Sequence, residues 1–275
     1  MSLVKQIFFV SSGAVFSKGT NFITLLVVAK LLNSNLLGIY SYFLLIINFL
    51  SPFIVFGFAQ FINYSITEKS SQKKITNTVT SFIIWSILIS SLLYVILFFI
   101  QFILNINILN YINNSFSDYK YLINYTILIS SFLSINLVLK NVLISLNKSK
   151  LILHASFIEG TSFFVLLISA AIFRKIDLMI FAYGFTQLLV TIFVIYKLKK
   201  YILIDYKTLS FNQIKQIPLK SYKLASGDVL WSFLNLLFMS LIATVSIDSL
   251  GNFHIANQVA MAILFIPTAI QPVLA

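Results

Sequence analysis

Residues Ile7–Leu32 read IFFVSSGAVFSKGTNFITLLVVAKLL, and this stretch decides the fold class. It is mainly apolar and exceeds the roughly 20 residues that an α-helix needs to cross a bilayer. Polar side chains interrupt it, and one of them, Lys18, is charged. At about 1.5 Å per residue, Lys18 lies about 16 Å past Ile7, near the middle of a roughly 30 Å core. A charge at that depth predicts a helix that faces protein or water on one side.

Similar apolar segments fill most of the chain, which is 59% hydrophobic and 9% charged, with a mean hydropathy of +0.98. Strands of a membrane barrel, which are about 10 alternating residues long, do not occur. We therefore predict an all-α, polytopic membrane helical bundle. Eight spans are expected, at residues 7–32, 37–62, 79–104, 122–146, 151–173, 178–196, 224–247 and 253 to the end.

The basic residues predict the orientation of these spans. The formal net charge is +12, but the lysines lie in short connectors, which indicates membrane topology rather than a nucleic-acid partner. Thirteen basic residues fall on the side of the N-terminus and four on the other side. This bias places the N-terminus in the cytoplasm.

The longest basic connector divides the chain into three parts. We expect a first six-helix bundle over 1–200, a cytoplasmic linker over 201–223 and two helices of a second bundle over 224–275. Tyr201–Ile204 fits part of an amphipathic helix on the inner leaflet or a plain loop. The sequence stays apolar to its last residue, so we expect a fragment whose second bundle is truncated.

The openings of the second and the eighth span resemble each other. Leu37–Tyr40 is followed by Pro52, and Leu250–Phe253 is followed by Pro267. The distance from glycine to proline is 14 residues in the first case and 16 in the second. Such an echo is typical of transporters built from two repeated halves.

The run Ala29–Tyr40, followed by Phe56–Phe58, resembles the start of the Wzx-type polysaccharide flippases of the multidrug/oligosaccharidyl-lipid/polysaccharide exporter superfamily. Lys30 stands where that family commonly has arginine. The eighth span looks like the corresponding start of the second half-transporter, with Leu250-Gly251, Ala256, Ile266-Pro267 and Ala269-Ile270.

This resemblance implies two six-helix bundles around a central cavity with alternating access, in the cytoplasmic (inner) membrane of a bacterium. The implied substrate is an oligosaccharide repeat unit on a polyprenyl pyrophosphate, moved to the periplasmic leaflet for O-antigen or capsule synthesis. It implies no enzymatic step and no cofactor.

Helical geometry indicates which side chains line such a cavity. One half of the first span carries Ser11, Ser17, Lys18, Asn21 and Thr24. Lys18 would attract a pyrophosphate as a point charge. The alternative is an ion pair with an intramembrane acid such as Glu159.

The seventh span carries a matching stripe of Asp228, Ser232, Asn235, Met239 and Ser246. Asp228 fits an H⁺ or Na⁺ coupling site, or equally an aspartate at a helix N-terminus.

Two further spans contribute candidates. The second offers Ser41, Asn48 and Asn63 around Pro52, which would bend the helix. In the fifth, Glu159 needs a partner or a proton, and we expect Lys18 or Lys140 to pair with it, although Lys140 is better placed to snorkel toward the cytoplasm. Glu159 is thus a second candidate for ion coupling.

Two other functions remain open. One is a cation-coupled antiporter of drugs or small metabolites with the same fold. The other, a membrane O-antigen polymerase or glycosyltransferase, is disfavoured because the connectors lack paired carboxylates and a Gly-rich phosphate loop.

Overall fold

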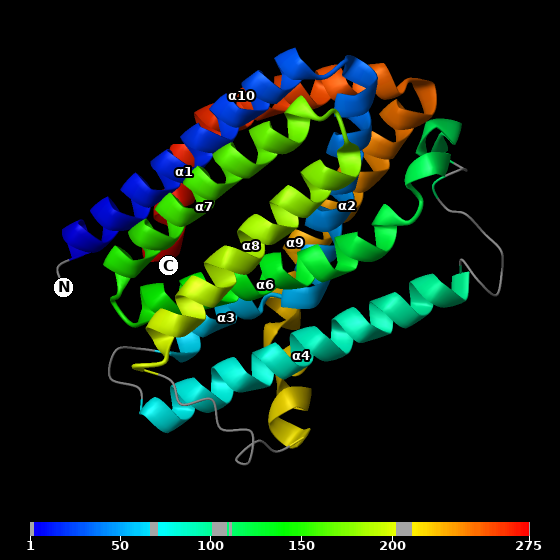
Figure 1. The fold of residues 1–275 in the computed structure, drawn as a ribbon. Coiled ribbons are helices and arrows are strands. Elements are labelled where there is room, and N and C mark those ends of the chain that lie inside the picture. The colour runs from blue at the N-terminus through cyan, green and yellow to red at the C-terminus, as the bar shows by residue number, and fades with distance from the viewer. Residues whose placement is uncertain (1–2, 67–70, 101–108, 110–111, 202–210, 275) are drawn as a thin grey trace.

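The computed structural model describes residues 3–66, 71–100, 109, 112–201 and 211–274, and every regular element within these ranges is a helix (Figure 1). Among the helices of these described ranges, seven are long and apolar enough to cross a membrane. The elements are α1 (Leu3–Leu31), α2 (Ser34–Val55), α3 (Phe58–Ser65), α4 (Gln72–Phe98), the 3₁₀-helix η2 (Asn114–Tyr119), α6 (Leu122–Ser145), α7 (Ser149–Ile172), α8 (Ile176–Leu198), α9 (Phe211–Val245) and α10 (Ile247–Leu274).

The predicted all-α membrane bundle is confirmed, and the described part of each expected span is helical, apart from the break in the second. The structure differs from the expected spans in two places. The seventh helix begins at Phe211, inside the region expected to be linker. The second span is two helices, because α2 ends at Val55 and α3 begins at Phe58. The proposed amphipathic stretch Tyr201–Ile204 lies almost wholly outside the described residues.

The break in the second span follows from Pro52 and from two residues in left-handed conformation. Phe56 has φ 46° and Gly57 has φ 70°. The freed backbone groups find partners, since the Phe56 amide donates to the Pro52 carbonyl at 2.8 Å and the Trp85 indole donates to the Ile54 carbonyl at 3.2 Å. Glycine is required at 57 because a Cβ there would also lie 2.6 Å from the backbone of α9.

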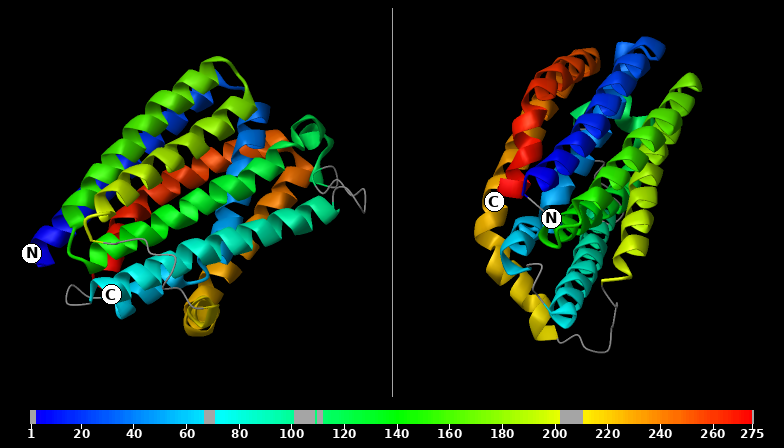
Figure 2. Two further views of the ribbon diagram at one scale, coloured as in Figure 1. Left: turned by 60° about the horizontal axis from the view of Figure 1, so that its bottom comes forward. Right: turned by 90° about the vertical axis from the view of Figure 1, so that its left-hand side faces the viewer.

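The helices form one elongated bundle, and the views of Figure 2 show α9 and α10 lying along the side made by α1 and α2. Within the rest of the bundle, α1 packs along α7, α7 along α8, and α6 between α2 and α8. The helix pair α9–α10 thus covers one face of the first part of the chain.

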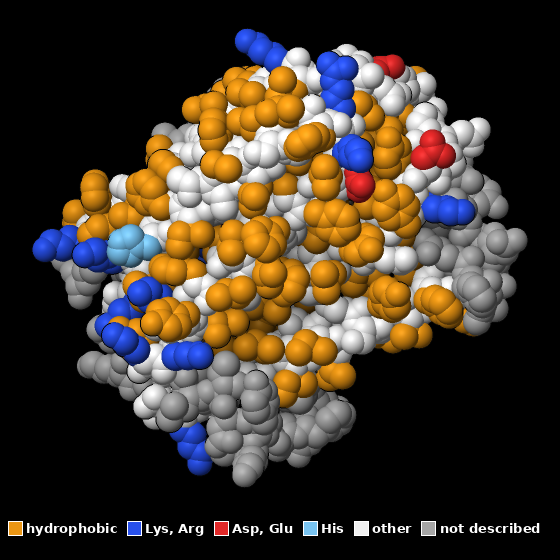
Figure 3. All heavy atoms as spheres, viewed as in Figure 1, with side chains coloured by type: hydrophobic (Ala, Val, Ile, Leu, Met, Phe, Trp, Pro, Cys, Tyr) orange, Lys and Arg blue, Asp and Glu red, His pale blue; other side chains and the backbone are white. Residues whose placement is uncertain are grey.

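The two ends of the bundle differ in charge. The lysine-rich end carries the described chain around residues 66 and 71, 146–148 and 199–201, and the lysine-poor end carries that around 32–33, 99–100, 112–121 and 173–175. Figure 3 shows an apolar belt between the charged side chains of the two ends. This distribution is the one expected of a bundle that spans a bilayer.

Two apolar clusters occupy the interior, one toward each end. The cluster at the lysine-poor end includes Tyr40, Phe43 and Phe116, and the cluster at the lysine-rich end includes Phe58 and Phe82. Between them lies a layer of polar side chains, which we call the polar layer. It consists of Ser17, Ser51, Ser130, Ser134, Asn136, Lys140, Glu159 and Gln187.

Candidate functional site

An ion pair joins two helices in the polar layer. Lys140 Nζ of α6 lies 2.8 Å from Glu159 Oε2 of α7, and their side chains are 23% and 16% exposed. The Ser17 hydroxyl of α1 donates to the same oxygen at 3.2 Å. Pairing of Glu159 with one of the two expected lysines is therefore confirmed, and that lysine is Lys140. The expectation that the Lys140 side chain extends toward the cytoplasm was wrong, because its ammonium group binds the Glu159 carboxylate inside the bundle.

Lys18 differs from Lys140 in having no such partner. It lies in the middle of the span Val4–Leu31 and is exposed, and among the described residues no carboxylate forms an ion pair with it. Its neighbour Ser17 is buried against α7. The stripe on α1 is thus divided, with Ser17 turned into the bundle and Lys18 at its edge.

Two other polar groups on α1 lack hydrogen-bond partners among the described residues. Asn21 Oδ1 and the Ser11 hydroxyl are buried atoms without a partner. Buried polar atoms are normally satisfied by protein or water. Thr24, in contrast, donates to the carbonyl of Thr20 in its own helix at 2.7 Å. The middle of α1 therefore has hydrogen-bonding capacity for water or a ligand.

A second polar contact lies deeper, between α6 and α8. Asn136 donates to Gln187 Oε1 at 2.8 Å and accepts a hydrogen bond from Thr191 at 2.9 Å. All three side chains are buried. Sequence reasoning missed this contact, because neither span has a charged residue at this position to draw attention to it.

The stripe on α9 also divides. Asp228 is exposed and accepts a hydrogen bond from Gln60 of α3 at 3.0 Å, whereas Met239 is buried in the apolar cluster of the lysine-poor end. Asn235 is half-buried. Since α9 begins at Phe211, Asp228 lies well beyond its first turn. The alternative of an aspartate held by the helix N-terminus was therefore wrong, as that effect is confined to the first turn.

The candidates on the second span do not share one face. Ser41 is buried and donates to the Leu37 carbonyl, Asn48 is exposed, and Asn63 donates to Asn141 of α6 at 3.1 Å. Of these, Asn48 is the side chain open to a ligand.

The two echoing segments meet at the lysine-poor end. A Cβ on Gly251 would lie 3.0 Å from the Gly38 nitrogen and in hard overlap with the Ser34 carbonyl, and a Cβ on Gly38 would overlap the Ile247 carbonyl. Ser34 also donates to Asp248 at 2.6 Å. Helices α2 and α10 thus pack backbone to backbone where each begins.

Other hydrogen bonds strengthen this contact from α9. The hydroxyls of Tyr42 of α2 and Ser240 of α9 are hydrogen-bonded at 2.9 Å between oxygens. The Asn113 amide donates to the Ala243 carbonyl of α9 at 3.1 Å. The lysine-poor end is therefore closed by direct contacts between α2 and the α9–α10 pair, which we call the end contact.

Comparison with known proteins agrees with this architecture. No curated protein and no solved structure shows significant similarity to the chain. Residues 3–274, nearly the whole chain, match the family described as polysaccharide biosynthesis protein. The chain is therefore a multi-pass membrane protein that belongs to the polysaccharide biosynthesis protein family.

Proposed function

We propose that this protein is a transporter that flips polyprenyl-pyrophosphate-linked oligosaccharide repeat units across the cytoplasmic membrane of a bacterium, for O-antigen or capsule synthesis. The N-terminus and the lysine-rich end lie in the cytoplasm, and the lipid-linked sugar moves to the periplasmic leaflet. The observation that carries the proposal is a mid-span lysine, Lys18, that forms no ion pair within the described residues, in a chain of the polysaccharide biosynthesis family.

The ion pair in the polar layer explains why Lys18 is available. Glu159 is the nearby carboxylate, and Lys140 neutralises it at 2.8 Å. Lys18 forms no ion pair among the described residues and acts on Glu159 more weakly than Lys140 does, so its charge is available to attract an anion such as a pyrophosphate. Asn21, Asn48 and Asn235 supply amide groups along the same route, and Ser17 holds Glu159 in place.

The end contact supports a gate on the periplasmic side. Gly38 and Gly251 bring the two halves of the transporter together at that end, and a substrate leaves when this contact opens. Asp228, which hydrogen-bonds to Gln60 between α9 and α3, is placed to bind H⁺ or Na⁺ and to couple its gradient to this movement.

A flipping assay tests the proposal. The full protein is reconstituted in liposomes with a fluorescent polyprenyl-pyrophosphate oligosaccharide, and flipping is followed by the accessibility of the sugar to an external glycosidase. Lys18→Ala should slow flipping about tenfold or more, since a contact to a charged group contributes about 1.5–3 kcal/mol. Lys5→Ala, which removes an exposed lysine near the start of the same helix, should not.

The outcomes separate the candidate functions. Flipping that is equally fast with Lys18→Ala and the parent contradicts the role of Lys18. Export of a cationic dye without any flipping of the glycolipid contradicts the flippase and favours a cation-coupled antiporter.

A further inference from the structure

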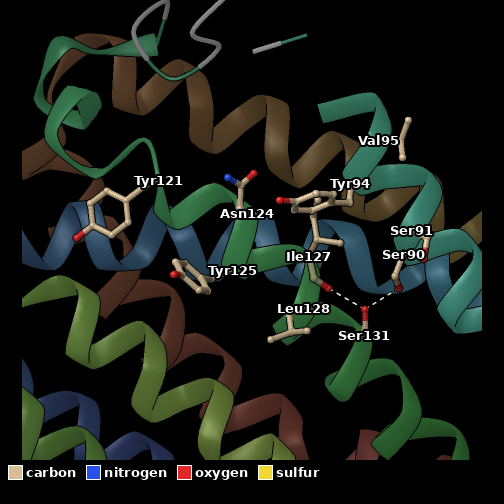
Figure 4. Close-up of a pocket in the computed structure, with 10 residues that line it drawn as sticks. All are labelled: Ser90, Ser91, Tyr94, Val95, Tyr121, Asn124, Tyr125, Ile127, Leu128 and Ser131. Carbon is tan, nitrogen blue, oxygen red and sulfur yellow. Dashed lines mark hydrogen bonds between the residues drawn. The ribbon is translucent and has the colours of Figure 1, made fainter. Parts of the chain in front are cut away.

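A groove lies between α4 and α6, away from the residues proposed for transport. It encloses about 610 Å³ and is lined by Ser90, Ser91, Tyr94, Val95, Tyr121, Asn124, Tyr125, Ile127, Leu128 and Ser131. This volume is within the usual range for small-molecule sites. Figure 4 shows that the lining residues come from α4 on one side and from α6 and the residue before it on the other, with Tyr94 lying toward α6.

The groove has the depth of about one leaflet. Tyr121 precedes α6 at the lysine-poor end, and Ser131 is ten residues farther along the helix. That distance is about 15 Å at 1.5 Å per residue, half of a roughly 30 Å core. The groove therefore runs from the membrane interface to mid-depth.

Its two ends differ in chemistry. At mid-depth, the hydroxyls of Ser90 and Ser131 lie 2.6 Å apart and join the two helices. Along the wall, Val95 and Leu128 are exposed apolar side chains. At the interface end, Tyr121, Asn124 and Tyr125 present phenol and amide groups. An amphiphile with its chain inward and its head at the interface matches this order.

Among the residues that the structure describes, none that lines the groove is charged. Its polar groups are phenols, hydroxyls and one primary amide, which both donate and accept hydrogen bonds. The Tyr125 ring is fixed by an edge contact with Phe181 at 4.7 Å between centroids. Such a lining suits neutral hydroxyl groups.

We propose that this groove binds a membrane lipid with an uncharged, sugar-type head group from the leaflet at the lysine-poor end. The chain lies along Val95 and Leu128, and the head-group hydroxyls bind Asn124 and the neighbouring tyrosines. The site is distinct from the candidate transport pathway, so this proposal can be tested independently of the flippase proposal.

Photolabelling tests this site. The full protein is placed in phosphatidylcholine nanodiscs and incubated with one of three photoreactive probes. All three carry the same alkyl chain with a diazirine, and their head groups are glucose, phosphocholine or phosphoglycerol. Mass spectrometry then maps the residues that each probe labels. The glucoside should label α4 and α6 most strongly. Asn124→Leu should lower its labelling about fivefold, as loss of about one hydrogen bond would, and leave the phosphocholine probe unchanged.

A steric variant and its control complete the test. Leu128→Trp should fill the groove and suppress glucoside labelling, whereas Leu137→Trp, at an exposed position of α6 outside the groove, should not. Gel filtration verifies that each variant is folded. Equal labelling of the groove by all three head groups, or labelling that survives Leu128→Trp, would overturn the proposal.

Discussion

Gly38 and Gly251 pack backbone against backbone at the lysine-poor end of the bundle, although they are 213 residues apart in sequence. They occupy matching positions in the two segments that resemble each other, each near the start of its helix. The two halves of the chain thus touch at equivalent points. Small residues at such a crossing allow helices in a membrane to approach closely.

Substitution at this crossing should destabilise the protein. Gly38→Ala places a methyl group against the Ile247 carbonyl, and overpacking of this kind costs about 1–3 kcal/mol. We expect a lower midpoint of thermal unfolding in detergent and slower flipping. Gly19→Ala is the matched control, because nothing lies within 4 Å of its added Cβ. Equal stability of the two variants would contradict the close contact.

The ion pair of the polar layer should show strong coupling between its partners. Lys140→Met leaves the Glu159 carboxylate without its counter-ion; breaking a fully buried pair costs about 3–5 kcal/mol, and breaking this partly exposed pair should cost less. The double variant with Glu159→Gln should recover most of that loss. Denaturant unfolding of the parent, both single variants and the double variant measures the coupling. Additive effects of the two single changes would show that the pair does not act as a unit.

Asp228 should govern the response to an ion gradient. In Asp228→Asn the amide cannot exchange a proton or balance a sodium ion, so flipping should lose its dependence on an imposed H⁺ or Na⁺ gradient. Asp118→Asn changes an exposed acid outside the spans and should retain the dependence. If Asp228→Asn responds to the gradient as the parent does, coupling resides elsewhere.

Two tyrosines at the lysine-poor end should ionise late in an alkaline titration. Burial is the largest cause that raises the pKa of Tyr119, and the negative charges of Asp118 and Asp177 raise it further. Burial is also the largest cause for Tyr121, and the charge of Asp177 raises its pKa further. Their pKa values are higher in the folded than in the unfolded state, so their contribution to stability is complete below about pH 10 and is lost as the pH rises through the folded values.

Asp177→Asn should lower the pKa of both phenols, which a difference titration of tyrosinate absorbance detects. Asp248→Asn serves as the control, since Asp248 is not among the groups that shift these two tyrosines. An unchanged titration curve in Asp177→Asn would mean that this acid does not act on them.

Sequence reasoning was most successful for features that depend on the residues of one helix alone. Apolar runs of about 20 residues or more predicted each of the seven spanning helices in the described part of the chain, because the bilayer dictates their length and polarity. The break at Phe56–Gly57 was not predicted, since Pro52 alone indicates only a bend. The early start of α9 at Phe211 was also missed, because its first turns are polar enough to resemble a linker.

Contacts between helices were harder to predict. A mid-span carboxylate requires a partner, so the pairing of Glu159 could be foreseen, but the choice of Lys140 depends on how α6 rotates against α7. The groove between α4 and α6 could not be foreseen at all. Tyr94 and Tyr125 meet there only through the packing of two helices, and each alone is an ordinary interfacial tyrosine.

The left-handed turn at Phe56 and Gly57 divides the second span into the long helix α2 and the short helix α3. A tilt of α2 need not be passed on to α3, so the short helix at the lysine-rich end can change its angle separately. Selection can therefore adjust the packing at that end of the bundle while leaving the opposite end as it is.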